Sequence, residues 1–445
     1  MIRRTRCLMD FLKSDVKRIY KKYLFPTLGS ALAMSIYSIV DTMAVGQYAG
    51  PVGTAAIAVV NPVYVIMIVI AFLCATGGSV RFGNTIGTGD GKKANEYFTA
   101  ALTLCCVMTL AAWVIFRIWY REIFAFFGAN EEVLPAASEY GIWIIRFFPV
   151  IVAPDFFASF LRMDGDPHRA LAAVVVGGGI NMFLDWLLVF PFGMGVKGAA
   201  VATVIGTFVQ CVIMLSHFCT DRNHLRLVSF SQPVKMMGKI VSTGISASVL
   251  DLGNVFLSFL MNNQIIKYGG TAVLGVYGVI NTIAILFQAL FSGVGQTIQP
   301  GVSINYGAGN RGRVLEFRKY AVRTAFLMGA AFTLLGELFP VQIVRLFMKA
   351  TPEAESAAPA FIRIYFISFL FLGYLVVSIY YLQSVMQRTA SSVIAVCRAF
   401  VFPAVFLLIL PYFMKLTGVY AAVTAAEILL FLCSASWQIK EKKHR

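Results

Sequence analysis

Charged side chains are scarce in this sequence. Only 13% of the 445 residues are charged, whereas 59% are apolar, and long stretches contain almost no charge. This balance lies far outside the range of soluble domains and excludes an ordinary water-soluble fold. A helix needs about 20 apolar residues to cross a membrane, and segments of this length recur along the whole chain. The composition therefore predicts an integral membrane protein with many spans.

Motifs of common enzymes are also missing. The sequence contains no HExxH and no GxSxG, and its four histidines fall in loops or near the ends of apolar segments. The eight cysteines form no CxxC pair and lie mostly in apolar segments, so we expect small core residues rather than a metal site. These absences argue against a membrane-embedded enzyme. We predict that the protein is not an enzyme and has no cofactor.

A glycine-rich run, GNTIGTGDGKKA, has a superficial likeness to a phosphate-binding loop. Its spacing is wrong, because Ile86 stands where the motif requires its first glycine and Lys93 replaces the Ser or Thr. The run also lies between two predicted spans rather than after a strand. No nucleotide site is visible, so we expect an ion gradient to supply the energy of any transport.

Twelve apolar segments are long enough to span a membrane as helices. They lie near 23–47, 55–79, 94–118, 134–161, 169–191, 198–219, 239–266, 272–298, 315–345, 357–384, 391–413 and 418–438. The predicted fold is therefore all-α, with twelve transmembrane helices.

The net charge of +16 is distributed unevenly along the chain. Lys and Arg gather in the terminal segments 1–22 and 439–445 and in alternate loops, whereas the opposite loops are short of basic residues. The positive-inside rule then places both termini in the cytoplasm, which agrees with an even number of spans. The first apolar segment lacks a convincing cleavage site and is expected to remain as the first span. We predict a multi-pass protein of the plasma membrane that does not bind nucleic acid.

The two halves of the chain resemble each other at an offset of 220 residues, the difference between 48 and 268. Asn, Glu, Pro and Tyr matches in register across some 150 residues are not expected by chance. Examples are Tyr48 with Tyr268, Asn61 with Asn281, Glu96 with Glu316 and Pro191 with Pro411. Because six is an even number of spans, both halves enter the membrane in the same orientation, as parallel repeats. We expect an N-terminal six-helix bundle over 23–219, an interlobe linker over 220–238 and a C-terminal six-helix bundle over 239–438.

A cluster of ionisable side chains is predicted in the first half only. Asp41 lies inside an apolar run, and Asn181 and Asp185 are four residues apart, which places both on one face of a helix. At the repeat offset, Met261 and Val405 stand in place of the two aspartates. If the two helix faces meet, two carboxylates in a low dielectric cannot both ionise cheaply, so one holds a proton. Carboxylates at membrane depth mark proton or ion paths, and this cluster can load and release protons.

Five motifs together resemble the multidrug and toxic compound extrusion (MATE) family. They are the run from Pro26 through VDTMAVG, GTGDGKKANEYF after the second span, RMDGDPHRA after the fourth, INMFLD in the fifth and GVKGAAVAT opening the sixth. The resemblance covers essentially the whole chain and implies two six-helix bundles. It also implies an antiporter that exports small amphipathic, often cationic organic compounds in exchange for H⁺ or Na⁺ by alternating access. We expect this chain to function as a monomer in the lipid bilayer, with no nucleotide.

The chain is similar to the DinF-like and archaeal branch of that family, whose coupling network lies in the N-terminal lobe. The resemblance makes two carboxylates the coupling site for H⁺, or for Na⁺ as the alternative ion, and gives them three hydrogen-bonding partners. The carboxylates are Asp41 and Asp185, and the partners are Tyr37, Asn181 and Thr203. Pro26 resembles the family's first-helix proline, which bends that helix, although a proline near a helix start is often only permissive.

Further candidates stay open. Asp155 either lines a substrate cavity or bonds to backbone groups freed by Pro154. Asp251 is a candidate for a secondary cation site, because another branch of the family places coupling carboxylates in the C-terminal lobe. The candidate cavity-lining side chains are Met182, Phe156 and Phe287.

A lipid-linked oligosaccharide flippase, or an exporter of another metabolite, is the alternative function within the same superfamily architecture. Such proteins often carry additional spans and basic residues that line the cavity. The deep charges predicted here are acidic, which favours cationic cargo.

Overall fold

The computed structural model describes residues 11–347 and 351–443, without the side chains of residues 439–443. Within these ranges the chain is almost entirely helical and contains no strand. It forms two compact units, Met1–Ser248 with Ser303–Asn310 and Val249–Val302 with Arg311–Arg445. The predicted basic segments 1–22 and 439–445 fall partly outside the described residues. The predicted lobe and linker boundaries stay predictions.

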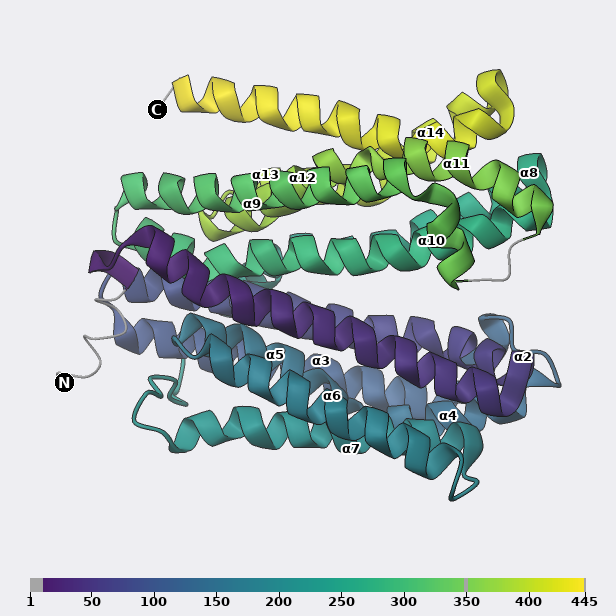
Figure 1. The fold of residues 1–445 in the computed structure, drawn as a ribbon. Coiled ribbons are helices and arrows are strands. Elements are labelled where there is room, and N and C mark those ends of the chain that lie inside the picture. Colours follow the sequence, from purple (N-terminus) through teal and green to yellow (C-terminus); the bar gives the residue numbers. More distant parts are fainter. Residues whose placement is uncertain (1–10, 348–350, 444–445) are drawn as a thin grey trace. The chain divides into compact units, whose positions relative to one another are not determined.

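Short turns join the helices of the first unit (Figure 1). Aspartates begin two of them, because the Asp15 side chain accepts from the Arg18 backbone N–H at 3.1 Å and Asp90 accepts from Lys93 N–H at 3.0 Å. The glycine-rich run around Asp90 is thus a turn and a helix start. The elements are α2 (Val16–Gly87), α3 (Gly91–Phe126), α4 (Val133–Arg146), α5 (Phe148–Met163), α6 (Pro167–Val189), α7 (Gly195–Leu215) and the 3₁₀ turn η1 (Ser216–Cys219).

The remaining helices lie in the second unit, which α8 enters from the first. They include a short π-helical segment, η2, between α13 and α14. The elements are α8 (Pro233–Gly307), α9 (Arg311–Leu338), α10 (Pro340–Phe347), α11 (Pro352–Phe366), α12 (Ser368–Ser384), α13 (Arg388–Val396), η2 (Cys397–Val401) and α14 (Phe402–Lys443).

Three long helices are each divided by a residue with a positive φ. Gly50 (φ 60°, ψ −146°) breaks α2, and Gly270 (φ 74°, ψ −170°) breaks α8. Glycine adopts such angles at little cost because it has no Cβ. Lys415 (φ 51°, ψ −128°) breaks α14 in a similar conformation. Figure 1 shows the chain reversing direction at the break in α2, so that α2 contains two antiparallel spans.

These breaks account for the twelve predicted spans. In the part of the chain that the structure describes, eight helices are long and apolar enough to cross a membrane, and three of them contain a break. The pair α4 and α5 supplies one more span, bent by 56° at Phe147 in front of Pro149. The predicted twelve-helix fold is confirmed, and the expected span 134–161 is a bent one.

The backbone repeats at the offset found in the sequence. The breaks of α2 and α8 are 220 residues apart, as are the turn glycines Gly89 (φ 86°) and Gly309 (φ 76°). The bend at Phe147 recurs at Ile367, the residue before α12. The two halves are therefore built on the same plan of helices and breaks.

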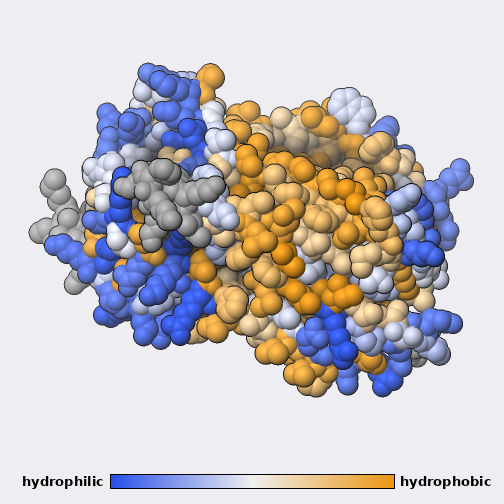
Figure 2. All heavy atoms as spheres, turned by 90° about the horizontal axis from the view of Figure 1, so that it is seen from above, coloured by the Kyte–Doolittle hydropathy of each residue, from blue (hydrophilic) through white to orange (hydrophobic). Residues whose placement is uncertain are grey.

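Apolar side chains cover the middle of the helices on the outside. On the face that Figure 2 shows, they form a broad band, and hydrophilic side chains gather at the two ends. Leu408 and Leu432 of α14, for example, are 64% and 54% exposed. Exposed apolar side chains of this extent suit the hydrocarbon core of a bilayer.

Candidate functional site

The predicted coupling residues of the first unit lie on helices that pack against each other. Asp41 is on the first half of α2, Asn181 and Asp185 are on α6, and Thr203 is on α7. Helix α2 packs against α4, α5, α6 and α7, and α6 packs closely against α7. The two faces that the sequence predicted to meet therefore belong to adjoining helices.

Small residues bring α6 and α7 together beside this site. A Cβ added at Gly206 of α7 would lie 2.7 Å from the carbonyl oxygen of Gly177 and 2.7 Å from the Cβ of Asn181. Glycine at this crossing lets the two backbones approach, as is common in membrane helix pairs. The approach places the Asn181 amide 3.5 Å from the Thr203 hydroxyl, to which its Nδ2 donates.

The carboxyl groups are buried and short of hydrogen bonds. Asp185 is 0% exposed, and neither of its oxygens has a hydrogen-bond partner among the described residues. Asp41 is 9% exposed, and its Oδ2 accepts from the hydroxyl of Tyr140 at 3.3 Å while Oδ1 has no such partner in the same ranges. Asn181 Oδ1 likewise lacks one there. Four side-chain oxygens of Asp41, Asn181 and Asp185 are thus left without donors.

Unsatisfied buried oxygens require a physical explanation. Nearly all buried polar groups in proteins find partners, and an isolated buried charge is much more costly than a buried dipole. Within the described residues no Lys or Arg forms an ion pair with Asp41 or Asp185, whose charges act on each other. A proton on a carboxyl group, or a cation held by these oxygens, would relieve both costs.

Tyr140 was not predicted from the sequence. It lies on α4, is 7% exposed and is the only hydrogen-bond donor to Asp41 that the described residues provide. A single tyrosine inside an apolar span carries no pattern that marks it, and only the bend between α4 and α5 shows which face of α4 turns toward α2.

Two predicted residues form a second polar group in the same unit. Tyr37 packs on Gly178 of α6, where an added Cβ would lie 2.9 Å from its ring. It interacts electrostatically with Asp155 more strongly than with Asp41. Asp155, on α5, is in turn influenced by the positive charge of Arg162. The structure therefore places Tyr37 and Asp155 beside the coupling carboxylates rather than in hydrogen bonds with them.

Pro26 lies inside α2, ten residues after the helix begins at Val16. The permissive role of a helix-start proline therefore does not apply. Its ring removes one backbone hydrogen bond of the helix, yet α2 keeps helical angles at this point and deviates only at Gly50. The hydroxyl of Ser30 donates to the Pro26 carbonyl at 2.9 Å. The helix is therefore continuous through the proline.

The remaining candidates take varied positions. Phe156 is 1% exposed and packs against Phe157 and Phe160 within the first unit. Phe287 is 9% exposed and stacks on Phe332 of α9 with ring centroids 3.6 Å apart. Both belong to aromatic clusters of their own unit. Met182 and Asp251 are partly buried, and a role in a substrate cavity stays a prediction for all four candidates.

The second unit contains a buried ion pair that has no counterpart at Asp41 and Asp185. Arg398 Nε lies 2.9 Å from Glu427 Oε1, and the two side chains are 10% and 8% exposed. Arg398 also donates to Gln288 at 3.0 Å. A cavity of about 20 Å³, enough for one water molecule, adjoins the pair. Here a positive charge compensates the buried carboxylate.

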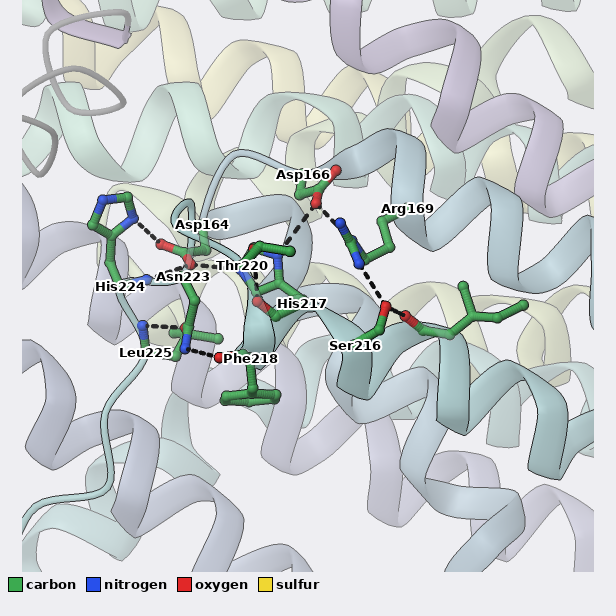
Figure 3. A network of polar contacts seen from close by, with 11 residues as sticks. Asp164, Asp166, Arg169, Ser216, His217, Phe218, Thr220, Asn223, His224 and Leu225 are labelled. Atoms are coloured by element: carbon green, nitrogen blue, oxygen red, sulfur yellow. Dashed lines mark hydrogen bonds and ion pairs between the residues drawn. The ribbon is translucent and has the colours of Figure 1, made fainter.

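A third polar network lies at the end of the first unit (Figure 3). His217 is 0% exposed, with Nε2 2.8 Å from Asp164 and Nδ1 3.2 Å from Asp166. Because carboxylates only accept, both ring nitrogens must donate, so the imidazole carries a positive charge. Arg169 Nε donates to the same Asp166 oxygen at 2.9 Å. The network joins the turn before α6 to the end of α7.

The segment that follows η1 is held by the same network. His224 donates its backbone N–H to Asp164 at 2.9 Å, and Figure 3 shows its ring beside the other carboxyl oxygen. Farther along, Arg226 N–H donates to Asn95 and Val228 N–H to Thr99, both on α3. The sequence analysis treated these histidines as unremarkable, because their partners are about 50 residues away in the chain.

The sequence matches the model of the MatE family over residues 26–187 and 247–409. It is 23% identical over 441 residues to the multidrug export protein MepA of Staphylococcus aureus (strain NCTC 8325 / PS 47), covering 96% of this chain and 94% of that protein. It is also 23% identical over 345 residues to the probable multidrug resistance protein YoeA of Bacillus subtilis (strain 168), covering 76% of this chain and 74% of that one.

Solved structures show the same fold. An outward-facing multidrug resistance MATE family transporter of the MOP superfamily has a TM-score of 0.90 at 21% identity, with 97% of each chain covered. A MATE transporter in the straight conformation has a TM-score of 0.91 at 21% identity, with 98% of this chain and 99% of that chain covered. The family match covers both halves, and the structural likeness runs through nearly the whole chain. The protein therefore belongs to the MatE family of membrane transporters.

Proposed function

We propose that the protein exports small amphipathic organic cations in exchange for H⁺ or Na⁺ bound at Asp41 and Asp185. The observation that carries the proposal is the set of four buried oxygens on Asp41, Asn181 and Asp185 that have no hydrogen-bond partner in the described residues. Membership of the MatE family and the likeness to the multidrug export protein MepA support export rather than a chemical reaction.

The two carboxylates suit reversible binding of a cation. When both are ionised, their charges repel each other in a buried environment that weakens the charged forms. One proton removes half of that charge and supplies a donor to an oxygen that lacks one. Na⁺ prefers oxygen ligands, and the free oxygens of Asp41, Asn181 and Asp185 are of that kind. Either ion binds more tightly when α2 and α6 bring the carboxylates together.

Coupling follows if the ion favours one conformation of the first unit. A ligand shifts a conformational equilibrium only by its difference in affinity for the two states. Binding from the outside would draw α2 toward α6 and displace the exported compound, and release into the cytoplasm would restore its binding. The acidic site, with no basic partner in the described residues, favours cationic rather than anionic cargo.

The test measures export of a fluorescent cationic dye from proteoliposomes under a pH gradient and, separately, a sodium gradient. We expect one gradient to drive the wild type, and we expect Asp41→Asn and Asp185→Asn to lower the rate at least tenfold at unchanged insertion. Glu139→Gln, which removes an exposed carboxylate next to Tyr140, is the matched control and should transport normally. Full export by both aspartate variants would contradict the coupling site, and dependence on Asp251 instead would move the site to the second unit.

A further inference from the structure

A groove of about 660 Å³ lies between α13 and α14 in the second unit. This volume is in the range of sites that bind organic ligands. One wall is the turn before α13 together with α13 and Cys397, and the other is α14. The lining residues are Met386, Gln387, Arg388, Thr389, Ala390, Val393, Ile394, Cys397, Phe402, Leu430, Cys433, Ser434 and Trp437.

The lining combines an apolar trough with one basic end. None of the lining residues is acidic, and the single charge is that of Arg388, which is exposed in the first turn of α13. The N-terminal end of a helix carries a partial positive charge that adds to the attraction of an anion. The trough thus fits a molecule with a negative head and an apolar tail.

The groove is open to the surroundings of the protein. Val393 is 54% exposed and Trp437 is 39% exposed, so the trough is reached from outside the helices. Tryptophan is enriched where membrane proteins cross the boundary between hydrocarbon and headgroups. The sequence that follows Trp437, QIKEKKHR, carries four Lys or Arg and one Glu. Positive charge at this end is therefore not confined to Arg388.

The corresponding end of the first unit satisfies its basic side chain internally. There Arg169 is bound by Asp166 at 2.9 Å, and Asp166 is also bound by His217. The second half has Gln387 in the turn before α13, and no carboxylate lines the groove. The anion that the chain itself provides in one half has no counterpart among the groove residues of the other.

We propose that this groove binds one anionic phospholipid of the cytoplasmic leaflet, with its phosphate at Arg388 and an acyl chain along Val393, Leu430 and Trp437. Basic pockets between transmembrane helices on the cytoplasmic side are known to take anionic headgroups. The lipid would fill the trough and hold α13 against α14. This site is separate from the ion-coupling site, and its occupancy does not depend on the exported compound.

The test uses mass spectrometry of the intact full-length protein in detergent, titrated with phosphatidylglycerol or with phosphatidylcholine of identical acyl chains. We expect one phosphatidylglycerol to be retained at concentrations at which phosphatidylcholine is not. Arg388→Gln should weaken phosphatidylglycerol binding about fivefold, the effect of one basic residue near an anionic lipid. The matched control is Arg311→Gln, an exposed arginine at the start of α9, which should bind as the wild type does.

A second variant tests the trough without changing charge. Val393→Trp places a large side chain in the groove at an exposed position, and we expect it to lose the retained lipid while keeping the melting temperature. Equal binding of both lipids, or wild-type binding by either Arg388→Gln or Val393→Trp, would overturn the proposal. Competition by glycerol 3-phosphate alone would mean that the site takes an anion without a chain, and competition by a cationic dye would make it a substrate site. Either result would also reject the lipid as its occupant.

Discussion

The two halves of this transporter share a backbone and differ in how they treat buried charge. The breaks at Gly50 and Gly270 and the bends at Phe147 and Ile367 recur at the same offset. The first half buries Asp185 without a hydrogen-bond partner in the described residues, whereas the second pairs Glu427 with an arginine. A compensated carboxylate has little reason to exchange its proton, while an uncompensated one gains from every cation that reaches it. The repeat thus separates a site that can load from one that holds the helices together.

The largest expected effect comes from breaking the ion pair of the second half. Glu427→Gln leaves the Arg398 guanidinium buried without its counterion, which we expect to cost about 3–5 kcal/mol. Asp185→Asn, in contrast, replaces an unpartnered carboxylate by a neutral group of similar size and should leave stability unchanged or raised. Thermal unfolding in detergent micelles measures both variants.

The double variant Arg398→Met with Glu427→Met is the control for this comparison. Replacing both charges by apolar side chains should recover most of the stability that Glu427→Gln loses, because neither partner is left buried and unpaired. If Asp185→Asn proved as destabilising as Glu427→Gln, the two carboxylates would be equivalent structural groups and the difference between the halves would not hold.

A smaller effect is expected at the charged network that closes the first half. Burial opposes ionisation of Asp166, but hydrogen bonds from His217 and Arg169 outweigh it and hold the pKa of Asp166 well below its usual range. A lowered folded-state pKa stabilises the protein above the ordinary aspartate pKa of about 4, and this stabilisation is lost as the pH falls through the folded-state value. The wild type should therefore lose stability below about pH 4.

Asp166→Asn tests that dependence. At neutral pH it should lower the free energy of unfolding by about 1–3 kcal/mol, the usual cost of losing charged hydrogen bonds to buried groups. Below pH 4 its melting temperature should fall less steeply than that of the wild type. Glu131→Gln, which alters an exposed carboxylate, should follow the wild-type curve. Parallel curves for Asp166→Asn and the wild type would show that Asp166 does not produce the acid sensitivity.

The sequence predicted the parts of the site that leave a local pattern. Asn181 and Asp185 are four residues apart on one helix, and the resemblance to the MATE family added Thr203, so adjoining helices were expected to carry the cluster. Tyr140 escaped because its role depends on which face of α4 turns toward Asp41.

Tertiary partners also explain what the sequence could not resolve for aromatic and histidine side chains. Phe156 and Phe287 are as apolar as any lipid-facing residue, and only packing shows that each joins an aromatic cluster. His217 lies beside no acidic residue in sequence, yet it meets Asp164 and Asp166 after α6 and α7 pair. The helices and their number follow from apolar length, whereas contacts between distant residues require the fold.

The smallest expected effect concerns the breaks that divide the long helices. Gly270 and Lys415 adopt similar backbone angles, but only the glycine does so without a Cβ clash. A non-glycine residue in this region stores about 1–3 kcal/mol of strain, so Lys415→Gly should raise the melting temperature and Gly270→Ala should lower it. An added Cβ at Gly270 meets no atom within 4 Å, so backbone strain alone would act in that variant. If both substitutions destabilised the protein, the lysine side chain would be contributing more than its strained backbone costs, and the break of α14 would not be a weaker copy of the glycine breaks in α2 and α8.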